Sequence, residues 1–324
     1  MKVLVCGGAG YIGSHMVRCL LAHHHEPVVY DNLSTGHREA VADVPLIVGD
    51  IRDSETLRTV FDQHCFDAAI HLCAHSLVGE SMNKPYEYYQ NNVFGTLCLL
   101  EAMHEADVTK LVFSSTAAVF GHPLAPLIDE EHAARPINPY GASKWMVERI
   151  LADAAPAYGL RSVSLRYFNA AGADPSGEIG ESHHPETHLI PNILRSALGK
   201  GSALKIFGDD YPTKDGTCVR DYIHVNDLAE AHLRAIRFLD QHDGAHCFNL
   251  GSSSGFTVLE IIEAARRVTG MDISFERASR RAGDPPVLVA SNVKARVQLG
   301  WRPAITNIDD IVRSAWLWHS QARY

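Results

Sequence analysis

Residues 2–14, Lys-Val-Leu-Val-Cys-Gly-Gly-Ala-Gly-Tyr-Ile-Gly-Ser, decide the fold. The apolar run 2–6 is typical of a buried parallel strand. Gly7, Gly10 and Gly13 follow it at the spacing G-x-x-G-x-x-G, and a helical pattern begins at this turn. Glycines let backbone N–H groups approach a pyrophosphate, and the N-terminus of a helix favours negative charge there. The stretch therefore predicts a dinucleotide-binding turn between a strand and a helix.

An acidic residue, Asp31, ends the next apolar run, 27–30. It follows Gly13 by about 20 residues, the distance at which a carboxylate meets a ribose 2′-hydroxyl in such folds. Its charge would repel a 2′-phosphate, so NAD is favoured over NADP. A glycine triplet alone often marks only a turn. The strand, the helix and Asp31 together predict bound NAD.

The first half of the chain alternates strand and helix patterns, which implies βαβ units and a parallel sheet. Strands are expected at 2–6, 27–30, 46–49, 68–72, 111–114 and 162–167, and helices at 12–22, 54–63, 89–106 and 139–155. The fold class is therefore α/β, with a Rossmann-type doubly wound parallel sheet. Ligands bind beyond the carboxyl ends of such strands. Asp50, Ile51, the segment 73–76 and Thr116 are expected on that rim.

The pattern changes after Tyr167. Residues 169–188 have a loop composition, rich in Gly, Pro, Ser and His. A helix at 189–198, a strand at 203–207, a loop at 208–216 and helices at 225–239 and 257–269 are expected next. We predict an NAD-binding domain over 1–168, with residues of about 216–250 packing back on it. Residues 169–324 would mainly form a smaller α+β substrate-binding lobe, with the active cleft between the two.

Composition excludes several classes of function. The 324 residues are 46% hydrophobic and 21% charged, which suits a sizeable core. The net charge of −9, without a Lys/Arg cluster, argues against nucleic acid or an anionic membrane as a partner. No apolar run is long enough for a membrane span, and the opening strand leaves no room for a signal peptide. Seven scattered cysteines without C-x-x-C predict reduced thiols and a cytoplasmic location. The histidines at 23–25 are interpreted as a solvated turn, and no metal site is predicted.

Tyr140 and Lys144 form a candidate acid–base pair. Asn138 is a predicted N-cap, which puts Tyr140 and Lys144 on one face of the following helix. Val147 and Leu151 continue this stripe, so the face should point inward. An ammonium beside a phenol lowers the pKa of the phenol, and the positive nicotinamide would act in the same direction. Tyr140 would then serve as the base for a sugar hydroxyl. An ordinary Tyr/Lys pair is the alternative, and the glycine turn upstream argues against it.

Thr116 follows the fifth expected strand, in the segment Val-Phe-Ser-Ser-Thr-Ala-Ala-Val-Phe-Gly at 112–121. A hydroxyl on this rim can donate to a developing oxyanion or relay a proton toward Tyr140. The alternative is a strand-end threonine that only caps a turn. With the other two signals present, we predict a catalytic role for Thr116.

Further segments identify a family. They lie at 7–15, 30–33, 49–52, 78–81, 88–92, 165–172, 216–225 and 280–284. The most specific are Gly-Thr-Cys-Val-Arg-Asp-Tyr-Ile-His-Val at 216–225 and Arg-Arg-Ala-Gly-Asp at 280–284. In these segments, from residue 1 to about 320, the chain resembles the UDP-hexose 4-epimerases of the extended short-chain dehydrogenase/reductase family.

The resemblance implies a reversible 4-epimerisation of UDP-glucose and UDP-galactose with tightly held NAD. Tyr140 would take the proton of the sugar 4-hydroxyl while C4 gives hydride to NAD, and Thr116 would hydrogen-bond that oxygen. The 4-keto sugar would swing about its diphosphate link, and hydride would return to the opposite face. Lys144 would also hold the ribose hydroxyls. The family often pairs through the helix that bears the Tyr/Lys motif, so a homodimer is expected.

The resemblance also implies which residues contact each ligand. In addition to Gly7, Gly10 and Gly13, the residues expected to contact the cofactor are Tyr11, Ile12, Asp31, Asn32, Asp50, Ile51, Leu72, Cys73, Ala74, Asn91, Tyr140, Lys144 and Phe168. In addition to Thr116, the residues expected to contact the substrate are Asn169, His188, Leu189, Lys205, Phe207, Arg220, Arg281, Asp284 and Leu288. The guanidinium groups of Arg220 and Arg281 suit a diphosphate, although either could equally be a surface ion pair.

The chain departs from the family pattern at three positions. Thr116 replaces the serine of many members and keeps the hydroxyl. Ser76 stands where some relatives carry a lysine near the cofactor, which leaves that contact open. Leu288 stands where some members place a large tyrosine beside sugar C2. The smaller side chain predicts activity on UDP-N-acetylglucosamine and UDP-N-acetylgalactosamine as well.

Two other functions compete with epimerisation. A nucleotide-sugar 4,6-dehydratase needs a carboxylate pair directly after the catalytic threonine, but Ala117 and Ala118 stand there. A non-catalytic NAD-sensing protein could keep the glycine turn and lose the Tyr/Lys pair, but this chain retains both.

Overall fold

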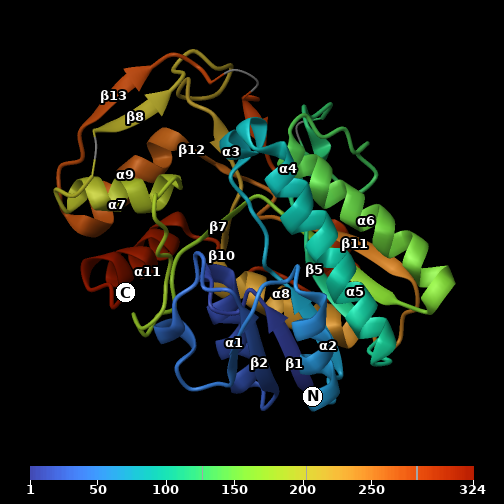
Figure 1. The fold of residues 1–324 in the computed structure, drawn as a ribbon. Coiled ribbons are helices and arrows are strands. Elements are labelled where there is room, and N and C mark those ends of the chain that lie inside the picture. The colour runs from blue at the N-terminus through green and yellow to red at the C-terminus, as the bar shows by residue number, and fades with distance from the viewer. Residues whose placement is uncertain (126, 202, 282–283) are drawn as a thin grey trace.

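A seven-stranded parallel sheet forms the centre of the computed structural model, which describes residues 1–125, 127–201, 203–281 and 284–324 (Figure 1). Its strands stand in the order β11-β6-β5-β4-β1-β2-β3. In that order their bounds are Ala245–Leu250, Arg161–Tyr167, Lys110–Ser114, Ala68–His71, Lys2–Cys6, Glu26–Asp31 and Leu46–Val48. Chain order reverses between β1 and β4, as in a doubly wound sheet. The predicted Rossmann-type fold is therefore confirmed.

Helices cover both faces of this sheet. On one face, α1 (Tyr11–Ala22) packs beside α8 (Val225–Phe238) over Val3 and Val5 of β1. On the other face, α2 (Ser54–Gln63), α5 (Gly95–Glu105) and α6 (Pro139–Tyr158) pack over Leu4 and Cys6. Successive side chains of a strand point to opposite faces. The apolar run 2–6 is therefore buried on both sides.

A second core lies beside the sheet, around α7 (Leu189–Ala197), α9 (Val258–Thr269) and α11 (Ile308–Ser320) (Figure 1). Small sheets accompany it, with the strand orders β13-β8, β12-β9-β14 and β10-β7. Those strands are Phe275–Ala278, Leu204–Phe207, Phe256–Thr257, Val219–Arg220, Val287–Leu288, Tyr222–His224 and Asn169–Ala171. The remaining short elements are η1 (Arg38–Val41), α3 (Val78–Asn83), α4 (Pro85–Tyr88), η2 (Tyr89–Phe94), η3 (Ala117–Phe120) and α10 (Val293–Gln298).

Several element predictions need correction. The helix expected over 89–106 is split, because the π-helical turn η2 precedes α5. The expected loop 169–188 begins with β7, which pairs with β10. Helix α6 continues past Pro156 to Tyr158 and ends at Gly159, which has the left-handed φ of a helix cap. In the part of the chain that the structure describes, no helix combines the length and apolarity that a bilayer span requires.

Candidate active site

A cleft opens at the carboxyl ends of β1, β2 and β4. It is lined by nine predicted cofactor residues, Gly7, Gly10, Asp31, Asn32, Ile51, Leu72, Cys73, Ala74 and Asn91. Ser76 lines the same cleft, and His188 of the predicted substrate set closes its far wall. Ile51 and residues 73–76 of the expected rim line the cleft, whereas Asp50 and Thr116 lie outside its lining.

The glycine turn leaves no room for side chains. A Cβ built on Gly7, whose φ is +79°, would lie 2.6 Å from the amide nitrogen of Cys73. A Cβ on Gly13 would lie 2.0 Å from the carbonyl oxygen of Gly7. Only glycine permits both the left-handed backbone and this close approach of turn, helix and β4. The bare backbone at the start of α1 is suited to a pyrophosphate.

Asp31 is held in place at the end of β2. Its Oδ2 accepts a hydrogen bond from the backbone N–H of Ala9 at 2.9 Å, and its Oδ1 accepts one from Leu33 at 2.8 Å. Burial raises the pKa of the Asp31 carboxyl, and the two amide bonds act against that rise. Each oxygen of a carboxylate can accept a further bond. Asp31 can therefore receive ribose hydroxyls while it fixes the glycine turn.

The other predicted cofactor residues lie outside the lining of this cleft. They are Tyr11, Ile12, Gly13, Asp50, Tyr140, Lys144 and Phe168. The Tyr11 hydroxyl donates to the carbonyl oxygen of Gly172 at 2.6 Å and so links α1 to the segment after β7. Asp50 is paired with Arg52 and Asn32, and the Arg52 guanidinium holds the pKa of that carboxyl well below its usual range.

Helix α6 presents the candidate catalytic pair as expected. Asn138 caps the helix by accepting a hydrogen bond from the N–H of Gly141 at 2.8 Å. Val147 and Leu151 are buried, so the stripe that carries Tyr140 and Lys144 faces inward. Both the cap and the inward face are confirmed.

Lys144 has a different partner from the one that its spacing suggests. Its side chain is buried, and Nζ donates to the carbonyl oxygen of Ser114 at 2.7 Å. The ammonium lies 4.5 Å from the centroid of the Phe113 ring, a cation–π distance. Burial lowers the pKa of Lys144 to about 8, and the negative charges of Cys73 and Glu148 limit this effect.

Tyr140 corrects one electrostatic prediction. Burial raises the pKa of its phenol, and the group that lowers this pKa is the hydrogen-bonding hydroxyl of Thr116 rather than Lys144. The oxygen of Thr116 also accepts from the N–H of Ala118 at 3.1 Å. Thr116 therefore caps η3 and still has its proton to donate toward the phenol oxygen. The capping alternative is therefore confirmed, and the catalytic role of Thr116 stays a prediction.

A buried network behind this group escaped the sequence analysis. The Ser115 hydroxyl donates to Oε1 of Glu148 at 2.5 Å, and Nε of Arg166 donates to the same oxygen at 3.0 Å. All three side chains are buried. The only feature of the sequence that could have indicated this network is that Glu148 follows Lys144 by one helical turn. The network ties the residue before Thr116 to the catalytic helix.

A second missed pair lies in the cleft wall. Thr96 donates its proton to the carbonyl oxygen of Asn92 at 2.6 Å, so Nε2 of His71 must donate to Thr96 at 2.8 Å. Nδ1 of His71 lies 3.6 Å from the sulfur of Cys73. The pKa of Cys73 falls to about 5 through the adjoining Cys6 thiol and His71. Nothing in the sequence predicts the contact between Thr96 and His71.

The predicted substrate residues gather on the small sheets. Lys205 and Phe207 lie on β8, Arg220 lies on β9, and Leu288 lies beside Arg220 on β14. Arg281 stacks over Phe207 at 4.1 Å from the ring centroid. Asn169 begins β7, and His188 and Leu189 lie at the start of α7.

Arg220 is already partnered within this group. It forms an ion pair with Asp284 and also donates to the carbonyl oxygen of Pro285 at 3.0 Å. The ion-pair alternative therefore holds for Arg220, which would have to share its donors with a diphosphate. Ala282 and Gly283, part of the specific segment 280–284, lie outside the described residues.

Comparisons with known proteins show the family of this chain. The model of the NAD dependent epimerase/dehydratase family matches residues 3–251. A UDP-glucose 4-epimerase of Streptococcus mutans is 54% identical over 323 residues, covering 99% of this chain and 97% of that protein. The structure of a Brucella ovis UDP-glucose 4-epimerase in complex with NAD is 47% identical, with a TM-score of 0.95 and 97% of both chains covered. A UDP-Glc/GlcNAc 4-epimerase of Campylobacter jejuni is 43% identical, with a TM-score of 0.88 and 99% of both chains covered.

Proposed function

Because the chain belongs to the NAD-dependent epimerase/dehydratase family, we propose that it catalyses the reversible 4-epimerisation of UDP-glucose and UDP-galactose. The observation that carries this proposal is that the Thr116 hydroxyl lowers the pKa of the Tyr140 phenol, while Lys144, one turn further along α6, holds a buried ammonium against the carbonyl oxygen of Ser114. One proton donor, one proton acceptor and one fixed positive charge are what the reaction requires at the C4 oxygen.

The cofactor of this proposal is NAD. The glycine turn fits a pyrophosphate, because the absence of Cβ atoms at Gly7 and Gly13 lets the bare start of α1 pack closely against the turn and β4. The Asp31 carboxylate fits two ribose hydroxyls and disfavours a 2′-phosphate. When bound, NAD supplies the acceptor and donor for the hydride of sugar C4. Asn91 and Ile51 would complete the walls of its cleft.

The protein's own residues handle the proton. Tyr140 Oη would take the proton of the 4-hydroxyl and return it in the second half-reaction. Thr116 would donate to the oxygen on C4 of the sugar in both half-reactions, because negative charge develops on that oxygen each time. Lys144, fixed by Ser114, would favour the phenolate once a sugar hydroxyl and the cofactor displace water from the site.

The substrate is proposed to lie across the small sheets, with its sugar toward Thr116. Arg281 and Lys205 offer positive charge to a diphosphate, and the exposed part of Phe207 offers a flat apolar surface. A diphosphate held at its centre lets the oxidised sugar turn and present its other face. The protein is further proposed to act in the cytoplasm as a homodimer.

Leu288 supports a wider choice of sugar. It packs against the cluster of Val119, Phe120 and Ile128, directly after the turn that carries Thr116. A leucine there leaves more room than a tyrosine. We propose that UDP-N-acetylglucosamine and UDP-N-acetylgalactosamine are also substrates. The dual name of the Campylobacter jejuni relative agrees with this range.

Dehydration is not favoured. Ala117 and Ala118 begin η3 directly after Thr116, so carboxylates are lacking where C5–C6 elimination would need an acid and a base. Epimerisation needs no such pair, because only hydride and one proton move.

The test is turnover without added cofactor. Purified protein should convert UDP-galactose to UDP-glucose in the absence of added NAD, and the Tyr140→Phe variant should not. Absence of conversion with UDP-galactose and with UDP-N-acetylgalactosamine, even after NAD is added, would contradict the proposal and favour a sensor. Equal turnover by Tyr140→Phe and the wild type would locate the base elsewhere.

A further inference from the structure

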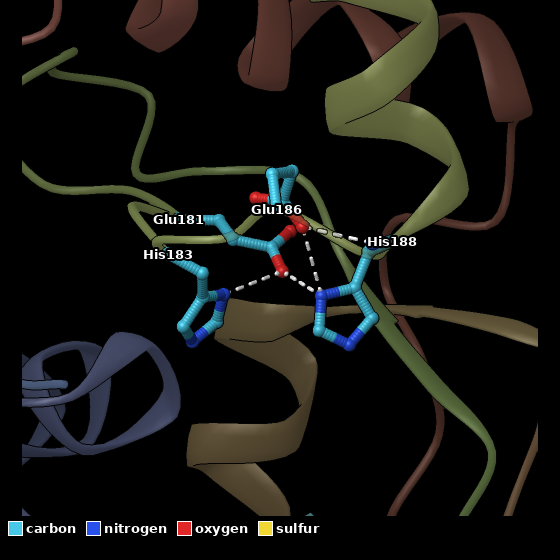
Figure 2. Close-up of side chains that lie close together, drawn as sticks. All are labelled: Glu181, His183, Glu186 and His188. Carbon is cyan, nitrogen blue, oxygen red and sulfur yellow. Dashed lines mark hydrogen bonds and ion pairs between the residues drawn. The ribbon is translucent and has the colours of Figure 1, made fainter. Parts of the chain in front are cut away.

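Four metal-ligating side chains converge in the segment between β7 and α7. We call Glu181, His183, Glu186 and His188 the Glu181–His188 cluster (Figure 2). They come from one stretch of eight residues, Glu-Ser-His-His-Pro-Glu-Thr-His at 181–188. Figure 2 shows both imidazole rings turned toward the two carboxylates. His183 and His188 also line the cofactor cleft.

The ligand atoms are already close to the spacing of a metal site. Oε1 of Glu181 lies 3.2 Å from Nδ1 of His183 and 2.7 Å from Nδ1 of His188. Oε1 of Glu186 lies 3.2 Å from the same nitrogen of His188, and one atom from each side chain lies within 4.8 Å of all the others. A tetrahedral ion bound at about 2.1 Å separates its ligand atoms by about 3.4 Å. To meet this spacing, the shortest pair would have to open by about 0.7 Å and the widest pairs close by up to about 1.4 Å.

Hydrogen bonds hold the backbone of Glu181 and the carboxylate of Glu186 in place. The carbonyl oxygen of Glu181 accepts from the indole N–H of Trp318 at 2.8 Å. The Glu186 carboxylate accepts from the backbone N–H groups of Thr187 and His188, both at 2.8 Å. Such outer contacts orient ligands before an ion arrives. Little rearrangement entropy would then oppose binding.

The charge of the cluster calls for a cation. Glu181 is only 4% exposed and the Glu186 side chain 2% exposed, and buried carboxylates need compensation. Both carboxylates converge on Nδ1 of His188. A divalent ion bound among these atoms would balance both negative charges.

We propose that the Glu181–His188 cluster binds a divalent cation of the zinc class. Two imidazole nitrogens with two carboxylate oxygens suit Zn²⁺ or Co²⁺, whereas Mg²⁺ and Ca²⁺ prefer oxygen alone. The ion would clamp the segment after β7 to the start of α7, at the edge of the cofactor cleft. The sequence analysis predicted no metal site, and this proposal departs from it.

The test is calorimetric titration of the untagged, chelator-treated holoenzyme with ZnCl₂. Wild type should bind one ion per chain. His183→Ala removes a half-buried ligand at the surface and should weaken binding at least about tenfold. Glu181→Gln, of nearly equal shape, should do the same.

The matched control is a second trio, Cys19, His23 and Glu230, whose ligand atoms also lie within 4.8 Å of one another. The double variant Cys19→Ser, His23→Ala should bind zinc as the wild type does. Co²⁺ added to the wild type should give the visible absorption of a tetrahedral nitrogen–oxygen site, and His183→Ala should abolish it. Unchanged zinc affinity in both cluster variants, or loss only in the control, would overturn the proposal.

Discussion

Lys144 donates from Nζ to the carbonyl oxygen of Ser114 at 2.7 Å, and this bond joins the catalytic helix to the end of β5. The bond fixes a buried positive charge at Ser114, directly before Ser115 and two residues before Thr116. Because Nζ is committed to a backbone carbonyl, we expect the ammonium to act on Tyr140 through its charge rather than as a hydrogen-bond partner.

The first prediction concerns this charge. Lys144→Met keeps the length of the side chain and removes its charge, so it should lower kcat by about 10²-fold or more while the protein stays folded. Steady-state kinetics with UDP-galactose, together with circular dichroism, measure both effects. Lys84→Met, at an exposed lysine, is the control. A kcat within twofold of the wild type would show that the charge is not used.

The second prediction concerns Thr116, whose hydrogen bond lowers the pKa of Tyr140. Thr116→Val is nearly equal in shape and cannot donate. The pKa of Tyr140 should therefore rise, and the pH at which kcat reaches half its maximum should move upward, with a loss of about 10²-fold at pH 7. Thr116→Ser restores the hydroxyl and should keep both the rate and the profile. A valine variant with an unmoved profile would contradict this role.

Much of this site could be predicted from the sequence because its signals are local. The glycine turn, Asp31 and the cap at Asn138 each depend on residues a few positions apart. The partner of Lys144 could not be found in this way, because it is a backbone carbonyl on a distant strand. β11 was missed for a similar reason, since its place beside β6 depends on a return of the chain after α8.

The third prediction concerns Leu288, which packs beside Phe120. Leu288→Tyr should fill the space expected for an N-acetyl group. The ratio of kcat/KM for UDP-N-acetylgalactosamine to that for UDP-galactose should fall at least about tenfold. Coupled assays on both substrates measure this ratio. Leu288→Met, of similar volume, should leave the ratio close to that of the wild type. Equal rates of Leu288→Tyr and wild type on the N-acetylated sugar would refute the idea.

The last prediction concerns three buried histidines, His15, His224 and His232. Burial lowers the pKa of each from 6.5 to about 4. Nδ1 of His232 must donate to the carbonyl oxygen of Leu228 at 2.7 Å, so its Nε2 accepts from the Ser114 hydroxyl at 2.8 Å. Nε2 of His15 has no partner among the described residues. The native fold therefore holds all three imidazoles neutral.

The unfolded chain binds these protons near pH 6.5, whereas the folded chain binds them only near pH 4. The contribution of the three histidines to the free energy of unfolding is therefore complete above pH 6.5 and falls as the pH drops toward 4. Each group contributes roughly 3 kcal/mol over that range. Urea unfolding of the holoenzyme at pH values from about 7.5 to about 4.5 measures how steeply the free energy of unfolding falls with pH. His15→Leu removes one titrating group and should make the slope shallower, whereas His104→Gln, at an exposed histidine, should not. A slope that His15→Leu leaves unchanged would mean that the proton uptake of unfolding occurs at other groups.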